Sequence, residues 1–218
     1  MKKMDHTIQF NHRVLYFVSS LVLYLVFSNT HANTVNGYVM GIQMTPAVCL
    51  MDSAKAKTRQ CLEGYALNIT GLYPETRQVD CQTNSSAALS PIQAKVVARV
   101  MPDERARVAL WRGIGGCVPM NASQYFRNVI NFADRLNIPA VMTTQASVRI
   151  QRDILTAMFI RLNPSLLEKS IHFQCNRYRN TTYLTNIKVC YNPVGQYKAC
   201  APTVITECPK TFTIKGSY

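Results

Sequence analysis

Three segments in the middle of the chain space their apolar residues three and four positions apart, which predicts helices with one buried face. The first begins at Pro91 after the capping residue Ser90. Either Asn121 or Ser123 can cap the second, and the third runs from about residue 148 to residue 162. The positions predicted to face inward in the first and third helices are Ile92, Val96, Val97, Val100, Ile150, Ile154, Leu155 and Met158.

Strand-like segments lie on both sides of these helices. Residues 38–44 and 67–69 come before them, and residues 171–175 and 182–191 come after them. The last segment alternates strictly between two sets of positions, which is typical of a strand in a sheet. Strands, then helices, then strands predict one α+β domain with a central antiparallel sheet flanked by helices.

The N-terminal 32 residues are predicted to be a signal peptide. Basic residues precede an apolar run from Val14 to Phe27, and a short polar segment ends at Ala32. The run is shorter than the roughly 20 residues of a transmembrane helix, and an uncleaved membrane anchor is the alternative. Cleavage would leave residues 33–218 as a single domain with no membrane span, which we expect to be a monomer in the periplasm or outside the cell.

The chain is basic, with a formal net charge of +13. Removal of the predicted signal takes away three cations and one acid, so the mature charge is +11. A basic surface attracts polyanions such as nucleic acid. Plain solubility is the alternative, because no run of Lys and Arg exceeds two residues.

All eight cysteines follow the predicted signal peptide. An even number of cysteines in an exported chain predicts a disulfide framework. A zinc site is disfavoured because the chain has no Cys-x-x-Cys pair and no paired histidines. The spacing alone does not choose among the possible connectivities.

Histidine content limits the chemistry. His172 is the only histidine after residue 32, and it stands in an apolar segment that favours a structural role. A mechanism with one histidine as base and another as acid is therefore excluded in a monomer. Motifs for serine hydrolases, phosphate-binding loops and zinc peptidases are absent, and Gly113–Gly116 is predicted to be a turn. We expect no metal and no cofactor.

Two short motifs and the cysteine positions resemble the ribonuclease T2 family. The first family motif places a histidine before Gly-Leu-Trp-Pro, and the matching run, LNITGLYP, spans residues 67–74. The second motif reads roughly His-Glu-Trp-x-Lys-His-Gly-Thr-Cys, and residues 109–117 read ALWRGIGGC. The order of further features, such as Met101-Pro102 and Tyr125-Phe126, extends the resemblance over most of the domain.

The resemblance implies that this chain keeps the family's fold. It also implies a catalytic chemistry whose residues this sequence lacks. Active members cleave RNA without metal: a histidine base activates the ribose 2′-OH, a histidine acid protonates the leaving oxygen, and Glu and Lys steady the intermediate. The five family positions are held here by Thr70, Ala109, Leu110, Gly113 and Ile114, none of which titrates near neutrality. The resemblance also implies the disulfides Cys49–Cys61, Cys81–Cys117, Cys175–Cys208 and Cys190–Cys200.

Two functions from different classes follow from this resemblance. The first is a non-catalytic protein that binds RNA in a cleft lined by Tyr73, Trp111 and Arg112, although core packing explains the two rings equally well. The ligand could equally be a protein or a glycan. The second is a weakly active RNA endonuclease that forms 2′,3′-cyclic phosphates with Arg112 and a tyrosine. In either case we expect Thr70 and Ile114 to lie across one cleft. A third interpretation is that the protein has no selected role.

Overall fold

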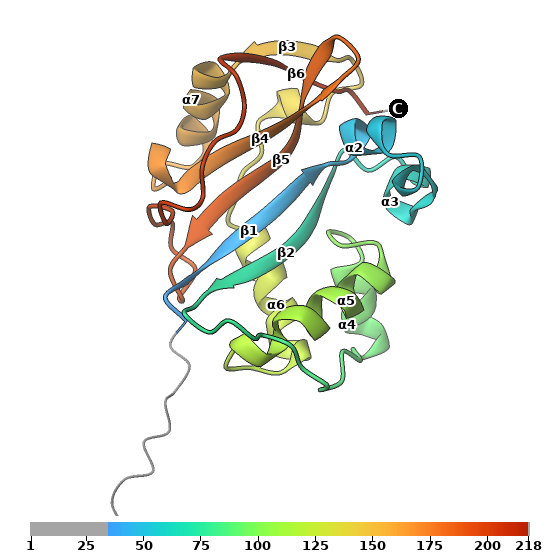
Figure 1. Cartoon of the computed structure of the whole chain (residues 1–218), viewed down its shortest axis with the longest axis vertical. Helices are drawn as coiled ribbons and strands as arrows, with labels where there is room; N and C mark the ends of the chain where they lie inside the picture. Colours follow the sequence, from blue (N-terminus) through green and yellow to red (C-terminus); the bar gives the residue numbers. More distant parts are fainter. Residues whose placement is uncertain (1–34, 218) are drawn as a thin grey trace, which may run out of the picture. The chain divides into compact units, whose positions relative to one another are not determined.

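A sheet of six strands organises the fold (Figure 1). The computed structural model describes residues 35–217, so the signal peptide predicted for residues 1–32 lies outside the described residues. The sheet follows the order β2-β1-β5-β6-β3, and β4 also pairs with β5. The strands are β1 (Gly37–Met44), β2 (Leu67–Glu75), β3 (Val148–Gln151), β4 (Ile171–Tyr178), β5 (Thr181–Tyr191) and β6 (Thr211–Ile214).

The sheet is mixed, and this modifies the prediction of an antiparallel sheet. Every pairing is antiparallel except that of β5 with β6, which meet in parallel at Tyr183 and Thr213. The antiparallel pairing of β6 with β3 fixes the direction of β6, and that direction is parallel to β5. The α+β class and the flanking helices are confirmed.

Helices flank the sheet and join its strands (Figure 1). Asn121 caps α6 in a capping box with Gln124, so of the two predicted caps Asn121 is the one used. No helix in the described part of the chain is long and apolar enough to cross a bilayer. The helices are α2 (Thr45–Met51), α3 (Arg59–Leu62), α4 (Pro91–Val97), α5 (Glu104–Ile114), α6 (Ala122–Ala133) and α7 (Arg152–Leu162), with 3-10 turns η1 (Lys55–Lys57), η2 (Gly115–Cys117), η3 (Ala140–Met142) and η4 (Glu168–Ser170).

Two helix predictions were partly wrong. The third helix begins at Arg152, because residues 148–151 pair with β6 as β3. Residues 148–151 form a strand because they pair with β6, which is distant in the sequence. A local pattern does not reveal such a pairing. The predicted buried faces were also too wide, since Ile92 is 80% exposed and Ile154 is 47% exposed. Helix α5 was not predicted as an element, because its sequence is rich in charged and small residues.

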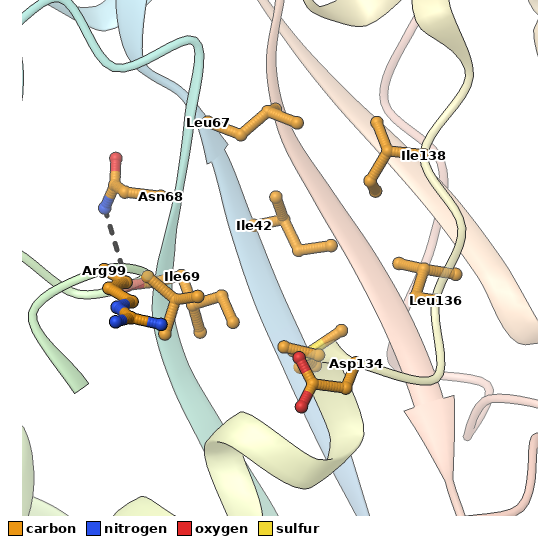
Figure 2. Close-up of a pocket in the computed structure, with 11 residues that line it drawn as sticks. Ile42, Leu67, Asn68, Ile69, Arg99, Asp134, Leu136 and Ile138 are labelled. Carbon is orange, nitrogen blue, oxygen red and sulfur yellow. Dashed lines mark hydrogen bonds between the residues drawn. The ribbon is translucent and has the colours of Figure 1, made fainter. Parts of the chain in front are cut away.

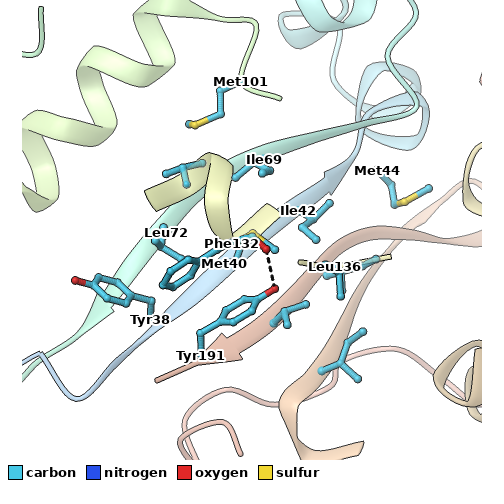
Figure 3. Close-up of a cluster of buried hydrophobic side chains, with 14 of the residues drawn as sticks. Tyr38, Met40, Ile42, Met44, Ile69, Leu72, Met101, Phe132, Leu136 and Tyr191 are labelled. Carbon is cyan, nitrogen blue, oxygen red and sulfur yellow. Dashed lines mark hydrogen bonds between the residues drawn. The ribbon is translucent and has the colours of Figure 1, made fainter. Parts of the chain in front are cut away.

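The core lies between α6 and one face of the sheet (Figure 3). Alternate residues of β1, among them Tyr38 and Met40, are buried there. The rings of Tyr38 and Phe132 meet edge to face, with centroids 5.9 Å apart. The Tyr191 hydroxyl donates to the Phe132 carbonyl at 3.5 Å, which ties the end of β5 to α6. Because this packing covers one face of β1 and β5, the opposite face of these strands is left open to solvent.

All four predicted disulfides are confirmed: Cys49–Cys61, Cys81–Cys117, Cys175–Cys208 and Cys190–Cys200. The described residues contain no free cysteine. Cys81–Cys117 ties the loop after β2 to the end of α5. Cys190–Cys200 closes the segment after β5. Four disulfides indicate a protein that folds in an oxidising compartment.

Removal of Cys81–Cys117 should destabilise the protein more than removal of Cys190–Cys200. The bonds close segments with sequence separations of 36 and 10, and loop entropy makes the longer closure worth about 1 kcal/mol more. Each bond joins one buried and one half-buried cysteine, so the two alanine double variants are matched in burial. Urea unfolding of Cys81→Ala/Cys117→Ala and Cys190→Ala/Cys200→Ala measures the difference, and the opposite order would contradict the entropic explanation.

Candidate functional site

The face of the sheet opposite α6 carries an open, mostly polar groove of about 590 Å³, which we call the sheet groove. It crosses β2, β1, β5 and β4, because residues that alternate with the core positions of these strands point to this side. Val39 and Gly41 form part of its floor. Its polar lining residues are Gln43, Lys55, Thr70, Tyr73, Gln174, Asn176, Thr185, Asn186 and Lys188.

Thr70 occupies a β-bulge at this groove. Gly41 pairs with Gly71 and Ile42 pairs with Ile69, so Thr70 is the extra residue between them. A Cβ atom on Gly41 would clash with Thr70 Oγ1, so the close approach of the side chain requires glycine there. Bulges commonly re-aim a side chain beside a functional site. Thr70, which the resemblance matches to a histidine, thus lines the groove with a hydroxyl group.

Buried hydrogen bonds hold β2 in place at Leu72, just after the bulge. The Tyr125 hydroxyl accepts from the Leu72 N–H at 2.9 Å and donates to the Leu72 carbonyl at 3.1 Å. Burial raises the pKa of Tyr125, so the hydroxyl stays protonated and keeps both roles. Tyr73 is 40% exposed, and its hydroxyl donates to the Thr70 carbonyl at 3.3 Å. The Tyr73 ring therefore lies at the surface of the groove on a rigid strand.

Trp111 belongs to the core. Its side chain is 1% exposed, its ring lies 5.7 Å from that of Tyr125, and its indole N–H is directed at the Ser85 carbonyl and hydroxyl. No face of the ring is open for a base to stack upon. Trp111 therefore packs in the core, which was the alternative interpretation of the sequence. The prediction that Trp111 lines a cleft with Tyr73 and Arg112 is wrong.

The other four positions that the resemblance matches to catalytic residues lie along α5. Leu110 packs on β2, where its Cδ1 atom would be 2.9 Å from a Cβ on Gly71. Ile114 is half-buried against the core and does not line the sheet groove. Ala109 and Gly113 are exposed, and nothing lies within 4 Å of a Cβ placed on Gly113. Leu110 and Ile114 thus make apolar contacts with β2 and the core, whereas Ala109 and Gly113 face solvent.

A second hollow of about 740 Å³, which we call the helix groove, lies between α5 and the segment η1–α3. Ala109 and Arg112 line it, whereas Thr70 and Tyr73 line the sheet groove. The structure therefore does not bring Tyr73 and Arg112 into one cleft. Successive helical residues point about 100° apart, so Trp111 can face the core while Arg112 faces solvent. The helix groove is lined by Lys57, Arg59, Pro102, Asp103, Glu104, Arg105, Val108, Ala109 and Arg112.

The sheet groove is positively charged. Lys55 and Lys188 line it, and no carboxylate does so among the described residues, although Asp52 lies 4.0 Å from Lys55. Lys188 of β5 pairs with Gly41 of β1 on one side and with His172 of β4 on the other, so the three residues lie in one row across the sheet. Burial, and then the charge of Lys188, lower the pKa of His172, whose Nδ1 lies 3.0 Å from the Thr206 hydroxyl. His172 is therefore neutral near pH 7 and hydrogen-bonded, as expected for a structural histidine.

A third, smaller hollow of about 190 Å³ lies on the core side of the sheet (Figure 2). Apolar side chains such as Ile42, Leu136 and Ile138 line it, and the Asn68 amide donates to the Ile69 carbonyl at its edge. None of the five positions matched to catalytic residues lines it, nor do Tyr73, Trp111 and Arg112. The described residues also contain no group of three or more His, Cys, Asp or Glu that could hold a metal ion.

Several groove residues were missed by sequence reasoning. Gln43, Gln174 and Asn186 supply amides to the sheet groove, and Lys55 and Lys188 supply its charge. The alternation of Asn186 and Lys188 with apolar residues in β5 was a usable signal, because it predicts a polar face. Nothing in the sequence indicated that η1 would bring Lys55 to the same place.

Comparison with known proteins identifies the class of fold. No model of a protein family matches the sequence, and no curated protein matches it. Solved structures do match. A point mutant of RNase MC1 in complex with 5′-UMP is 14% identical, with a TM-score of 0.62 over 82% of this chain and 98% of that chain. The Japanese pear S3-RNase is 16% identical, with a TM-score of 0.60 over 84% of this chain and 100% of that chain.

RNase NT in complex with 5′-AMP is similar to the same extent, with 14% identity and a TM-score of 0.61 over 84% of this chain and 98% of that chain. These neighbours are all ribonucleases. They are T2 family ribonucleases, and this chain has the ribonuclease T2 fold. The fold predicted from the two motifs is confirmed.

Proposed function

We propose that this chain is an exported, non-catalytic member of the ribonuclease T2 family that binds single-stranded RNA in the sheet groove. The observation that carries the proposal is the groove itself, which keeps an exposed tyrosine, several amides and two lysines but presents Thr70 in place of a histidine. Lysines attract phosphates, amides can pair with base edges, and an exposed ring can stack on a base.

The neighbours support this choice of ligand. RNase MC1 and RNase NT were crystallised with the nucleotides 5′-UMP and 5′-AMP, and they share the fold of this chain. The alternative of weak cleavage by Arg112 and a tyrosine is disfavoured, because Arg112 and Tyr73 line different hollows. An uncharged glycan would gain nothing from the charge of Lys188, to which the described part of the chain supplies no ion pair.

Lys188→Gln and Tyr73→Ala should each weaken binding of a fluorescent four-nucleotide RNA to the purified, oxidised protein. Loss of a charged hydrogen bond costs about 1.5–3 kcal/mol, so we expect roughly tenfold weaker binding or more for Lys188→Gln. Loss of base stacking costs about 1–3 kcal/mol, which predicts a similar effect for Tyr73→Ala. Fluorescence anisotropy at fixed salt measures the Kd of each variant.

Lys95→Gln is the matched control, because Lys95 is an exposed lysine of α4 that lines neither the sheet groove nor the helix groove. It removes the same charge and should leave the Kd nearly unchanged. An equal loss with Lys95→Gln would mean that binding reflects net charge alone. No detectable RNA binding by the unmodified protein would overturn the proposal and leave a protein or glycan as the ligand.

A further inference from the structure

The helix groove concentrates four cations, and the described part of the chain supplies an ion pair to only one of them. Lys57, Arg59, Arg105 and Arg112 line it, and all four side chains are exposed. Arg59 forms an ion pair with Glu63 at 2.6 Å. The structure gives no ion pair to the other three cations among the residues that it describes. Unpaired like charges in one hollow repel each other, and a bound polyanion relieves that repulsion.

The two acids in this groove have local structural roles. Asp103 caps α5 by accepting from the Ala106 N–H at 3.1 Å. Glu104 is the first residue of α5, where a negative charge interacts favourably with the helix dipole. Neither carboxylate forms an ion pair with a cation of the groove. The groove thus presents a net positive surface to solvent.

Helix α5 spaces two of these cations along one face. Arg105, Ala109 and Arg112 stand at positions i, i+4 and i+7, which share a face of a helix. The seven-residue rise separates the two arginines by about 10 Å along the helix axis. This spacing suits successive phosphates of a chain better than one phosphate. Ala109 leaves the floor between the two guanidinium groups open.

The helix groove adjoins the sheet groove through the short turn η1. Lys55 lines the sheet groove and Lys57 lines the helix groove, although they are only two positions apart. In a 3-10 turn this separation is about 4 Å along the axis. Lysines thus line both sides of the boundary. Asp52 lies 4.0 Å from Lys55 on the sheet-groove side, whereas Lys57 on the helix-groove side has no ion pair among the described residues.

We propose that single-stranded RNA bound in the sheet groove continues past η1 into the helix groove, where Lys57, Arg105 and Arg112 hold its phosphates. This inference rests on the proposed function and adds to it a second segment of the binding site. RNA is the polyanion that the surroundings favour, because the helix groove extends a groove with an exposed tyrosine and amides that can recognise bases. The helix groove itself has no aromatic lining residue among those described, so it should contact the backbone and not the bases.

The test compares a dinucleotide with a ten-nucleotide RNA of the same composition. On the unmodified protein the longer RNA should bind at least tenfold more tightly. Arg105→Gln/Arg112→Gln should weaken binding of the longer RNA about tenfold and leave dinucleotide binding unchanged. The slope of log K against log salt should also fall by about 1.4 for the longer RNA, since each phosphate contact to a single strand contributes about 0.7.

Arg127→Gln/Arg161→Gln is the matched control, because it removes two exposed arginines of α6 and α7 that line neither groove. It should leave both affinities and the salt slope unchanged, and all variants should keep their melting temperature. Equal affinities for the two RNA lengths, or an equal loss in the control, would overturn the inference and leave the proposed function standing. Absence of dinucleotide binding would instead count against the proposed function. Binding of dextran sulfate through the two arginines, without any dependence on RNA length, would assign the helix groove to other polyanions and reject the RNA path.

Discussion

The purified, oxidised protein should cleave RNA no faster than background between pH 4 and pH 8 without metal. General acid and general base catalysis each contribute about 10²- to 10⁴-fold, so loss of both predicts a rate about 10⁴- to 10⁸-fold below that of an active ribonuclease of this fold. The hydroxyl of Thr70 and the methyl of Ala109 cannot exchange a proton near neutrality. Detection of 2′,3′-cyclic phosphate ends by chromatography is the measurement.

Contaminating nuclease is the main experimental risk in that assay, and the sheet groove supplies a control. Lys188→Gln, purified in the same way, should lower any cleavage that the groove itself performs and leave contaminant activity unchanged. His172→Ala tests the single imidazole beside the groove in the same manner. Cyclic phosphate formation that both substitutions reduce would refute the non-catalytic assignment and restore the weak endonuclease as the function.

The double substitution Thr70→His/Ile114→His should not restore full activity and should lower the melting temperature. Thr70 lines the sheet groove, whereas Ile114 is half-buried against the core and outside that lining. The sequence predicted both positions across one cleft, and the packing of α5 places only Thr70 in the groove. Histidines at these positions would also lack a carboxylate and a lysine on α5, because Leu110 and Gly113 stand at the positions that the resemblance matches to them.

The stability effect of the double substitution comes from position 114. Burying an isoleucine contributes about 1.5–3 kcal/mol, and Ile114 is partly buried, so we expect a loss of about 1–2 kcal/mol. For a domain of this size that corresponds to about 2–8 °C in melting temperature. Thr70→His alone should change the melting temperature little, and Ile114→Val keeps the apolar contact as a control. A large gain in RNA cleavage at unchanged melting temperature would show instead that the two positions share an open, hydrated site.

Local sequence patterns were sufficient for the parts of the fold that depend on neighbouring residues. Asn121 and Ser90 cap α6 and α4, because capping requires only a short polar side chain before a helical segment. The alternation in residues 182–191 predicted β5 for a similar reason. The two motifs and the cysteine positions carried the fold and all four disulfides, but only through resemblance to a family, since spacing alone does not fix connectivity.

The sequence by itself determined which residues stand at the positions that the resemblance matches to the family's catalytic set. Thr70, Ala109, Leu110, Gly113 and Ile114 carry no acid, base or charge, and this holds in any conformation. Only the tertiary structure decided what these positions and their neighbours contact. In the structure, Trp111 points into the core and Leu110 packs on Gly71. Tyr73 and Arg112 line different grooves. Lys55 lies in the same groove as Lys188. Each of these outcomes depends on which face of α5 meets β2 and on where η1 lies against the sheet, and such contacts join residues that are distant in the chain.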